Sequence, residues 1–126
     1  MRPAVYDAGV LVAADRNVRA VWAEHRARLE AGIVPVVPAP VVAQVSRSAA
    51  QVQLRRLLRG CEVAALTGEA AHAAGYLLGR ASTSDVADGV VAETATRLHA
   101  DVLTGDRADI ARLLDAAGAD ARIIDL

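Results

Sequence analysis

Carboxylates at four places in this 126-residue chain could act together: Asp7, Asp85, Asp88 and Asp106. Asp7 and Asp106 each follow a short apolar run that is typical of a β-strand. Asp85 and Asp88 are three residues apart where a helix is expected to begin, and such positions share one helix face. Ligands of open α/β sheets bind beyond the carboxyl ends of the strands. The four side chains are therefore expected to converge on one cleft.

Carboxylates that lie close together repel one another, which raises their pKa values unless a cation neutralises them. The chain has no lysine; its 14 basic residues are all arginine, and few of them stand near these acids in the sequence. A hard divalent cation is therefore the expected neutraliser, and oxygen-only ligands favour Mg²⁺ or Mn²⁺ over Zn²⁺. Such an ion would lower the pKa of a bound water and stabilise charge on a phosphodiester.

Simpler explanations exist for three of these acids. Asp85 and Asp88 would be favoured by the dipole of a helix that begins there, and Asp106 would suit an Asx turn or a helix cap. Asp7 is harder to explain by a structural role, because burying an acid directly after a strand costs free energy unless the acid has a function. Asp7 therefore favours the interpretation as a site.

Short apolar runs alternate with segments of helical period along the whole chain, which predicts an α/β fold: a three-layer α/β/α domain with a central parallel sheet of about five strands. The length suits a single domain spanning residues 1–126. Strands are expected at Ala4–Tyr6, Ile33–Val37, Cys61–Ala65, Asp101–Thr104 and Arg122–Ile124. Helices are expected at Gly9–Ala14, Val18–Ala31, Pro40–Arg47, Val52–Arg59, from the cap Thr67 to about Arg80, at Asp85–His99 and at Ala108–Ala117.

The amino-acid composition limits which residues can form the core and which functions the protein can have. Hydrophobic residues make up 54% of the chain but aromatic residues only 2%, with no Phe, so the core must be built from Ala, Val, Leu and Ile. The net charge of −1 provides no global field that attracts nucleic acid, so such a role needs a local arginine patch or a metal ion. The single Cys61 cannot form an internal disulfide, and the apolar N-terminal run is too short to span a membrane. A cytoplasmic protein is expected.

Three segments carry a family resemblance: the opening VYDAGVLVA, the middle PAPVVAQV and the block TSDVADGVVAETATRLHADVLTGDRADI. With them the chain resembles PIN-domain proteins of the group that includes VapC-like toxins, over essentially its whole length. The resemblance implies a PIN-like fold and a metal-dependent endoribonuclease that is the toxin of a toxin–antitoxin pair. It also implies an RNA substrate, a cognate antitoxin protein and a homodimer. Asp7, Asp88 and Asp106 would then be the catalytic acids that hold the metal.

The chain departs from the family pattern at two places. Gln44 stands where the family usually has Glu, which keeps an oxygen ligand but loses a negative charge, so metal affinity should fall. Asp85 is expected to offset this loss, which gives a predicted metal shell of Asp7, Asp88, Asp106, Asp85 and Gln44. Ala8 and Gly9 stand where many relatives have hydroxyl residues that could orient water or anchor the loop.

Two other functions stay open. A non-catalytic PIN-like binding module, weakened by Gln44, would bind a partner without cleaving RNA. A phosphoacceptor receiver domain also gathers acids at strand ends, but receivers need a Lys near the pocket, and this chain has none. Metal-dependent cleavage of single-stranded RNA would separate the nuclease from the binding module.

Four further residues have weaker predicted roles. Asp109 follows Asp106 by three residues and is either a partner behind the metal ligands or a solvated acid. Thr104 either hydrogen-bonds a carboxylate or a water or simply ends its strand. Arg80 and Arg107 are expected near the cleft and are therefore candidates for contact with phosphate.

Overall fold

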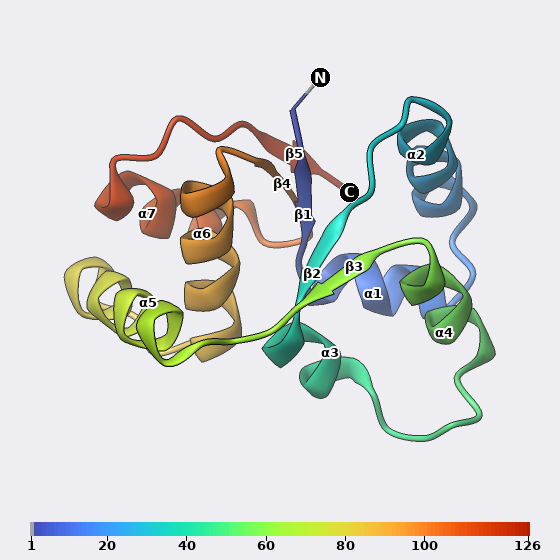
Figure 1. Cartoon of the computed structure of the whole chain (residues 1–126), viewed down its shortest axis with the longest axis horizontal. Helices are drawn as coiled ribbons and strands as arrows, with labels where there is room; N and C mark the ends of the chain where they lie inside the picture. The colour runs from blue at the N-terminus through green and yellow to red at the C-terminus, as the bar shows by residue number, and fades with distance from the viewer. Residues whose placement is uncertain (1) are drawn as a thin grey trace.

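The computed structural model describes residues 2–126, and over that range it has a single five-stranded sheet with helices on both sides (Figure 1). All strand pairs are parallel, and the strand order is β3-β2-β1-β4-β5. This confirms the predicted three-layer, PIN-like α/β fold. The strands are β1 (Ala4–Tyr6), β2 (Val36–Pro38), β3 (Glu62–Ala64), β4 (Asp101–Thr104) and β5 (Ile123–Asp125).

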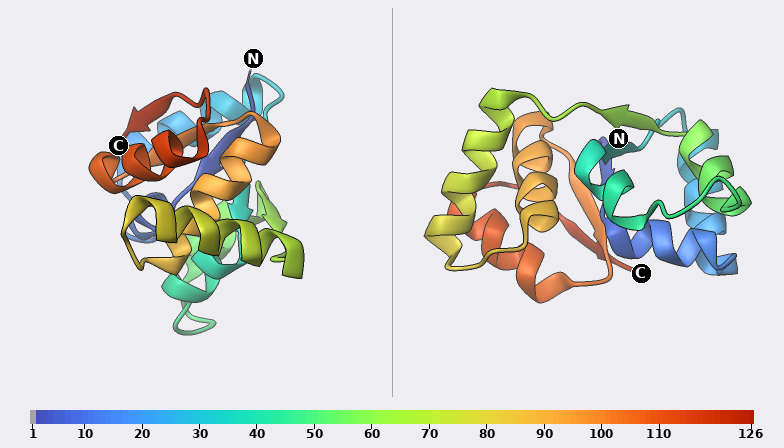
Figure 2. Two further views of the ribbon diagram at one scale, coloured as in Figure 1. Left: turned by 90° about the vertical axis from the view of Figure 1, so that its left-hand side faces the viewer. Right: turned by 90° about the horizontal axis from the view of Figure 1, so that it is seen from below.

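Seven helices connect the strands in the order expected from the sequence, within the described residues. On one side of the sheet, α5, α6 and α7 pack together; on the other, α1 contacts α2, α3 and α4 (Figures 1 and 2). The helices are α1 (Ala8–Asp15), α2 (Arg19–Glu30), α3 (Ala39–Val45), α4 (Val52–Arg59), α5 (Gly68–Ala81), α6 (Val86–Leu98) and α7 (Arg107–Ala117).

Most element boundaries differ from the sequence prediction by one to three residues, and two of the differences have identifiable reasons. The second strand was expected from Ile33, but β2 begins only at Val36. Pro35 has no amide to donate to a sheet, and its carbonyl oxygen accepts the Glu62 amide at 2.8 Å, so the ladder with β3 starts there. The helix expected from Asp85 begins one residue later, because Asp85 is its N-cap.

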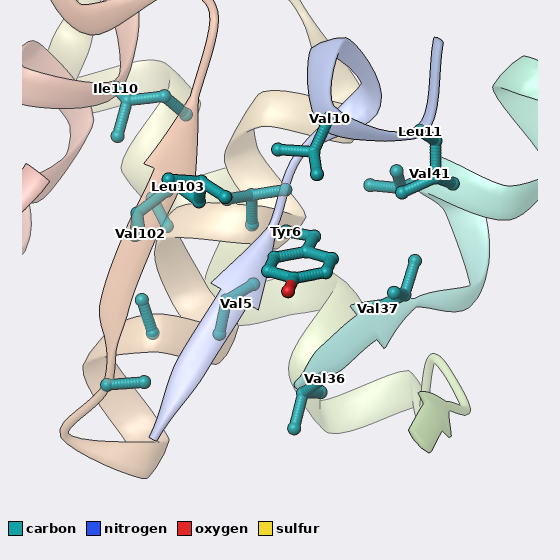
Figure 3. Close-up of a cluster of buried hydrophobic side chains, with 14 of the residues drawn as sticks. Val5, Tyr6, Val10, Leu11, Val36, Val37, Val41, Val102, Leu103 and Ile110 are labelled. Atoms are coloured by element: carbon teal, nitrogen blue, oxygen red, sulfur yellow. The ribbon is translucent and has the colours of Figure 1, made fainter. Parts of the chain in front are cut away.

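The core is aliphatic, as the composition predicts. Val5, Val37 and Leu103 are buried on β1, β2 and β4, and Ile110 of α7 belongs to the same cluster on the side of Leu103 (Figure 3). The one large aromatic in this layer is Tyr6, which is fully buried and bonds through its hydroxyl to Nδ1 of His25 at 2.9 Å. Among residues 2–126, no helix is long and apolar enough to cross a membrane.

Strand register brings the ends of β1 and β4 together. Tyr6 pairs with Leu103, and the Asp7 amide donates to the Leu103 carbonyl at 3.2 Å. The residues that follow these two strands therefore meet at the carboxyl edge of the sheet. Helix α6 begins at the same edge, beside α3, which Figure 2 shows from below.

Candidate functional site

Asp7 occupies a buried position between β1 and α1. It is the N-cap of α1, and its Oδ1 accepts the Val10 amide at 3.3 Å. Only 4% of the residue is exposed. A side chain at Gly9 would approach both Asp7 Oδ1 and the Gly105 backbone at 3.3 Å, so this end of α1 packs closely on the turn after β4. The small residues Ala8 and Gly9 permit that approach.

The hydroxyl of Thr104 joins Asp7 to the loop that carries Asp106. It donates to Oδ2 of Asp7 and accepts the Asp106 amide at 2.8 Å. Thr104 is fully buried, so neither bond competes with bulk water. Of the two roles left open by the sequence, the structure shows the hydrogen bond to a carboxylate.

The start of α6 holds Asp85 and Asp88 next to each other. Asp85 is exposed and caps the helix by accepting the Asp88 amide at 3.0 Å. Asp88 is half-buried in the first turn. The cap bond is a structural role for Asp85, as the simpler explanation expected, and it also keeps the two carboxylates at one helix end.

The start of α7 contributes Asp106 and Asp109. Asp106 occupies the N-cap position but makes no cap bond with its side chain, so its carboxylate is left free of that role. Carboxylate oxygens of Asp88, Asp106 and Asp109 all lie within 4.8 Å of one another. The role of Asp109 stayed open from the sequence, where the available signal was its spacing of three residues from Asp106 in a first helical turn.

The pKa values of these acids depend on the charges of their neighbours. The pKa of Asp88 is raised to about 7, first by burial and then by the charges of its neighbours. Those neighbours are Asp85, Asp7, Asp106 and Asp109. The pKa of Asp109 is raised chiefly by its hydrogen bond with Asp106. Burial also raises the pKa of Asp7, although the Thr104 hydroxyl and backbone amides oppose that shift.

Asp101 is another buried acid, but unlike the acids of the site it lies beside two arginines. Asp101 is equally buried, at the opposite end of β4, but it contacts Arg2 at 3.1 Å and Arg122 at 3.5 Å. It borders a hollow of about 600 Å³ that is otherwise lined largely by alanine and isoleucine. Within the described part of the chain, the site acids have one basic contact, Arg112 to Asp109 at 3.9 Å. The positive charge that balances Asp101 is therefore missing from the site.

The donor set fits a hard divalent cation. All donors are carboxylate oxygens, which Mg²⁺ and Mn²⁺ prefer. Oxygens bound to one octahedral Mg²⁺ at about 2.1 Å lie about 3 to 4 Å apart, so the spacing in the three-acid cluster needs only small side-chain movements. Asp88, Asp106 and Asp109 together could hold a metal ion.

Gln44 belongs to α3, which contacts α6. It is exposed on α3 and borders a hollow of about 300 Å³ that also has Ala8, Asp15 and Arg16 in its wall. Because Ala8 directly follows Asp7, this hollow begins beside the site rather than inside the acid cluster.

The two arginines considered for phosphate contact have other surroundings. Arg107 donates through Nε to Asp125 at 2.9 Å and through a terminal nitrogen to the Ile123 carbonyl at 3.0 Å, so its guanidinium is bound to β5. Arg80 borders a hollow between α5 and α6 with Glu93 and Arg97. Neither contacts the acids of the site.

Comparison with known proteins shows a likeness of structure only. No family model matches the sequence, and no curated protein matches it. The VapBC2 complex of Rickettsia felis, solved with a DNA fragment from its promoter, has a chain with a TM-score of 0.73 and 14% identity, covering 98% of both chains. FitAcB of Neisseria gonorrhoeae has a TM-score of 0.66 and 14% identity over 96% of each chain. FitAB bound to the IR36 DNA fragment has a TM-score of 0.66 and 14% identity, covering 97% of this chain and 94% of that one.

These findings correct the family assignment made from the sequence. Membership of the PIN-domain family as a VapC-like toxin is wrong as an assignment, because no family model matches and the neighbours are VapBC2 and FitAB assemblies at only 14% identity. A likeness at that level does not say which component of such an assembly a chain corresponds to. The chain shares its fold with chains of VapBC2 and FitAB, and its site must be judged from its own residues.

Proposed function

We propose that this protein is a metal-dependent endoribonuclease that hydrolyses RNA phosphodiesters with Mg²⁺ or Mn²⁺. The observation that carries the proposal is the meeting of carboxylates from the starts of α6 and α7, with almost no basic partner and with Asp7 close enough for its charge to raise the pKa of Asp88. Carboxylates in that state attract a divalent cation. Phosphodiester hydrolysis is the chemistry that a Mg²⁺ or Mn²⁺ carboxylate site supports best.

In this proposal Asp7, Asp88 and Asp106 hold the metal and are the catalytic acids, while Asp85 and Gln44 complete the shell directly or through water. A bound Mg²⁺ or Mn²⁺ would supply an activated water and offset charge on the phosphodiester. Asp109 lies close enough to Asp88 and Asp106 to add a further oxygen.

The surrounding residues orient these acids before substrate binds. The Thr104 hydroxyl holds Oδ2 of Asp7 and the Asp106 amide in one arrangement. The Asp85 cap holds the first turn of α6, and with it Asp88. Groups that are held in place in advance cost no reorganisation during the reaction.

We also propose an antitoxin protein as partner and a homodimer as the assembly, in the cytoplasm. Support for the partner comes from the structural neighbours, which are antitoxin–toxin complexes, two of them solved with DNA. The RNA substrate is inferred from the site chemistry.

A non-catalytic binding module is the second candidate, and Gln44 favours it. Its amide adds no negative charge to a metal site, and it is exposed at the border of a hollow lined by residues from α1 and α3. A module of this kind would bind its partner and fail to cleave RNA with any metal.

The test is cleavage of a panel of structured and single-stranded RNAs by purified protein with Mn²⁺, with Mg²⁺ and with EDTA. We expect cleavage that depends on the metal and is abolished in Asp7→Asn, because the amide cannot replace the anionic ligand. Asp7→Asn should remain folded, since burial already disfavours the charged form of Asp7. Unchanged activity in Asp7→Asn would overturn the proposal.

The matched control for this assay is Asp115→Asn, which removes an exposed carboxylate from α7 away from the site. It should cleave like the wild type. A folded wild-type protein that cleaves no RNA with either metal would instead support the binding module.

A further inference from the structure

Charge is divided unevenly along the chain. Residues 1–66 carry nine arginines and five acidic residues, whereas residues 67–126 carry five arginines and ten acidic residues. The first part forms α1 to α4 on one side of the sheet, and the second forms α5 to α7 on the other (Figure 1). A net charge near zero therefore conceals a basic side and an acidic side.

Ion pairing makes the division sharper. Over residues 2–126, eight arginines have no carboxylate within 4.0 Å, and seven of them belong to the basic side. The eight are Arg16, Arg19, Arg26, Arg47, Arg55, Arg56, Arg59 and Arg80. Arginines without an acidic partner leave a positive charge that can bind an external anion.

Two of these arginines border the hollow that begins beside Asp7. Ala8 and Val12 of α1 form one wall with Arg16, and Gln44 of α3 forms the opposite wall with Arg47. We call this hollow the α1–α3 groove. Arg16, the C-cap of α1, lies eight residue steps after Ala8, a rise of about 12 Å along the helix. The groove therefore extends from the residue after Asp7 to a pair of arginines.

The segment that carries Arg47 is held in place by Gln51. Its amide oxygen accepts the backbone amides of Arg47 at 2.6 Å and Ser48 at 3.1 Å, and its amide nitrogen donates to Asp15 at 3.2 Å and to the Val45 carbonyl at 3.1 Å. Asp15 is the one carboxylate that lines the groove, and it thus accepts a hydrogen bond from Gln51. Arg47 itself donates to the carbonyl of Ala43 in α3 at 3.1 Å and to that of Ser46, the C-cap, at 2.8 Å.

We propose that the α1–α3 groove binds the phosphate backbone of a single-stranded RNA, with Arg16 and Arg47 contacting phosphates farther along the strand from the cleaved bond. This rests on the proposed function for the choice of RNA. A strand whose reacting phosphate lies at the acids must continue across a neighbouring surface. The groove is such a surface. Its arginines can donate to the phosphates of the strand, whereas the acidic side of the protein would repel them.

An acidic segment of a protein partner is the other anion that two arginines would attract. The position of the groove favours RNA, because Ala8 connects its wall directly to Asp7. Binding of an acidic peptide would not require that continuity with the acid cluster.

The experiment measures binding of a fluorescently labelled single-stranded RNA by anisotropy in EDTA, where no metal supports cleavage, at several salt concentrations. The test variant is Arg16→Ala/Arg47→Ala. The matched control is Arg26→Ala/Arg80→Ala, which removes two exposed, unpaired arginines from outside the groove and changes the net charge equally. A polyglutamate peptide serves as the second probe.

We expect the groove variant to bind RNA about tenfold more weakly or worse. Its slope of log affinity against log salt should fall by about 1.4, since each phosphate contact on a single strand contributes about 0.7. The control pair should bind like the wild type. Arg16→Ala alone should show about half of the change in slope, which keeps the test valid if loss of the Arg47 bonds disturbs the loop.

Two results would overturn the proposal. Equal weakening in both double variants would show that only net charge matters. Loss of polyglutamate binding with RNA binding intact would assign the groove to an acidic protein. Binding is measured without metal, so the two proposals can fail separately. If the groove variant binds RNA more weakly but the wild type never cleaves RNA, the groove is retained and the nuclease is rejected. If the wild type cleaves RNA but the groove variant binds RNA as the wild type does, the nuclease is retained and the groove is rejected.

Discussion

At the scale of single residues, Thr104 links the two halves of the acid site. Its hydroxyl donates to Asp7 and accepts from the Asp106 amide, and it is fully buried. A valine of similar shape would leave the buried Oδ2 of Asp7 and the Asp106 amide without this hydrogen-bond partner. The behaviour of the site therefore depends on one oxygen atom that carries no charge.

Thr104→Val should destabilise the protein by about 1 to 3 kcal/mol, the cost of leaving a buried polar group unsatisfied, and should reduce RNA cleavage strongly. Urea unfolding and the cleavage assay measure the two effects. Thr104→Ser is the control, because it keeps the hydroxyl and should retain most activity. Equal losses in the valine and serine variants would indicate that the methyl group, and not the hydroxyl, matters.

At the scale of elements, the position of α6 depends on its close packing against α5. A Cβ built on Gly89 would lie 2.8 Å from Cγ of Leu78, which no real contact allows. Gly89 directly follows Asp88, so this contact determines how far the start of α6 lies from α5. In contrast, a Cβ on Gly79 of α5 meets nothing within 4 Å.

Gly89→Ala should lower the free energy of unfolding by about 1 to 3 kcal/mol through overpacking, despite the better helix propensity of alanine. Gly79→Ala should raise it by about 0.5 to 1 kcal/mol, because the backbone entropy of glycine is removed without a clash. Urea midpoints compare the two variants. A stabilised Gly89→Ala protein would show that α5 and α6 are not in close contact at this position.

At the scale of the whole molecule, the acid site links stability to pH and to metal. The folded-state pKa of Asp88 is about 7, and that of Asp7 is also raised. An acid whose pKa is raised on folding binds more protons in the folded state than in the unfolded state. Its stabilising contribution is therefore complete below about pH 4 and is lost as pH rises through the folded pKa.

In EDTA, the melting temperature should consequently fall between about pH 5 and pH 8, with Asp88→Asn showing a shallower fall because its amide does not titrate. Adding Mn²⁺ at pH 8 should restore stability, since an ion that binds only the folded state stabilises it. Thermal unfolding across this pH range measures both effects. A melting temperature that rises with pH in EDTA would contradict the assigned pKa shifts.

Much of the fold could be predicted from the sequence because its determinants are local. Alternation of short Val-rich runs with helical periods predicted the order of strands and helices, and the fold class is confirmed by the parallel five-stranded sheet. Asp7, Asp88 and Asp106 could be placed at one sheet edge for the same reason, because parallel strands end on the same side. Their catalytic role stays a proposal.

Only the tertiary structure decided which side chains meet. Strand register and helix packing bring Asp109 to Asp88, place the Thr104 hydroxyl between Asp7 and Asp106, and leave Gln44 in the α1–α3 groove. They also bind Arg107 to Asp125 of β5, far along the chain. Local patterns determine where a strand ends, whereas contacts between residues distant in sequence depend on how the elements pack, which no local pattern records.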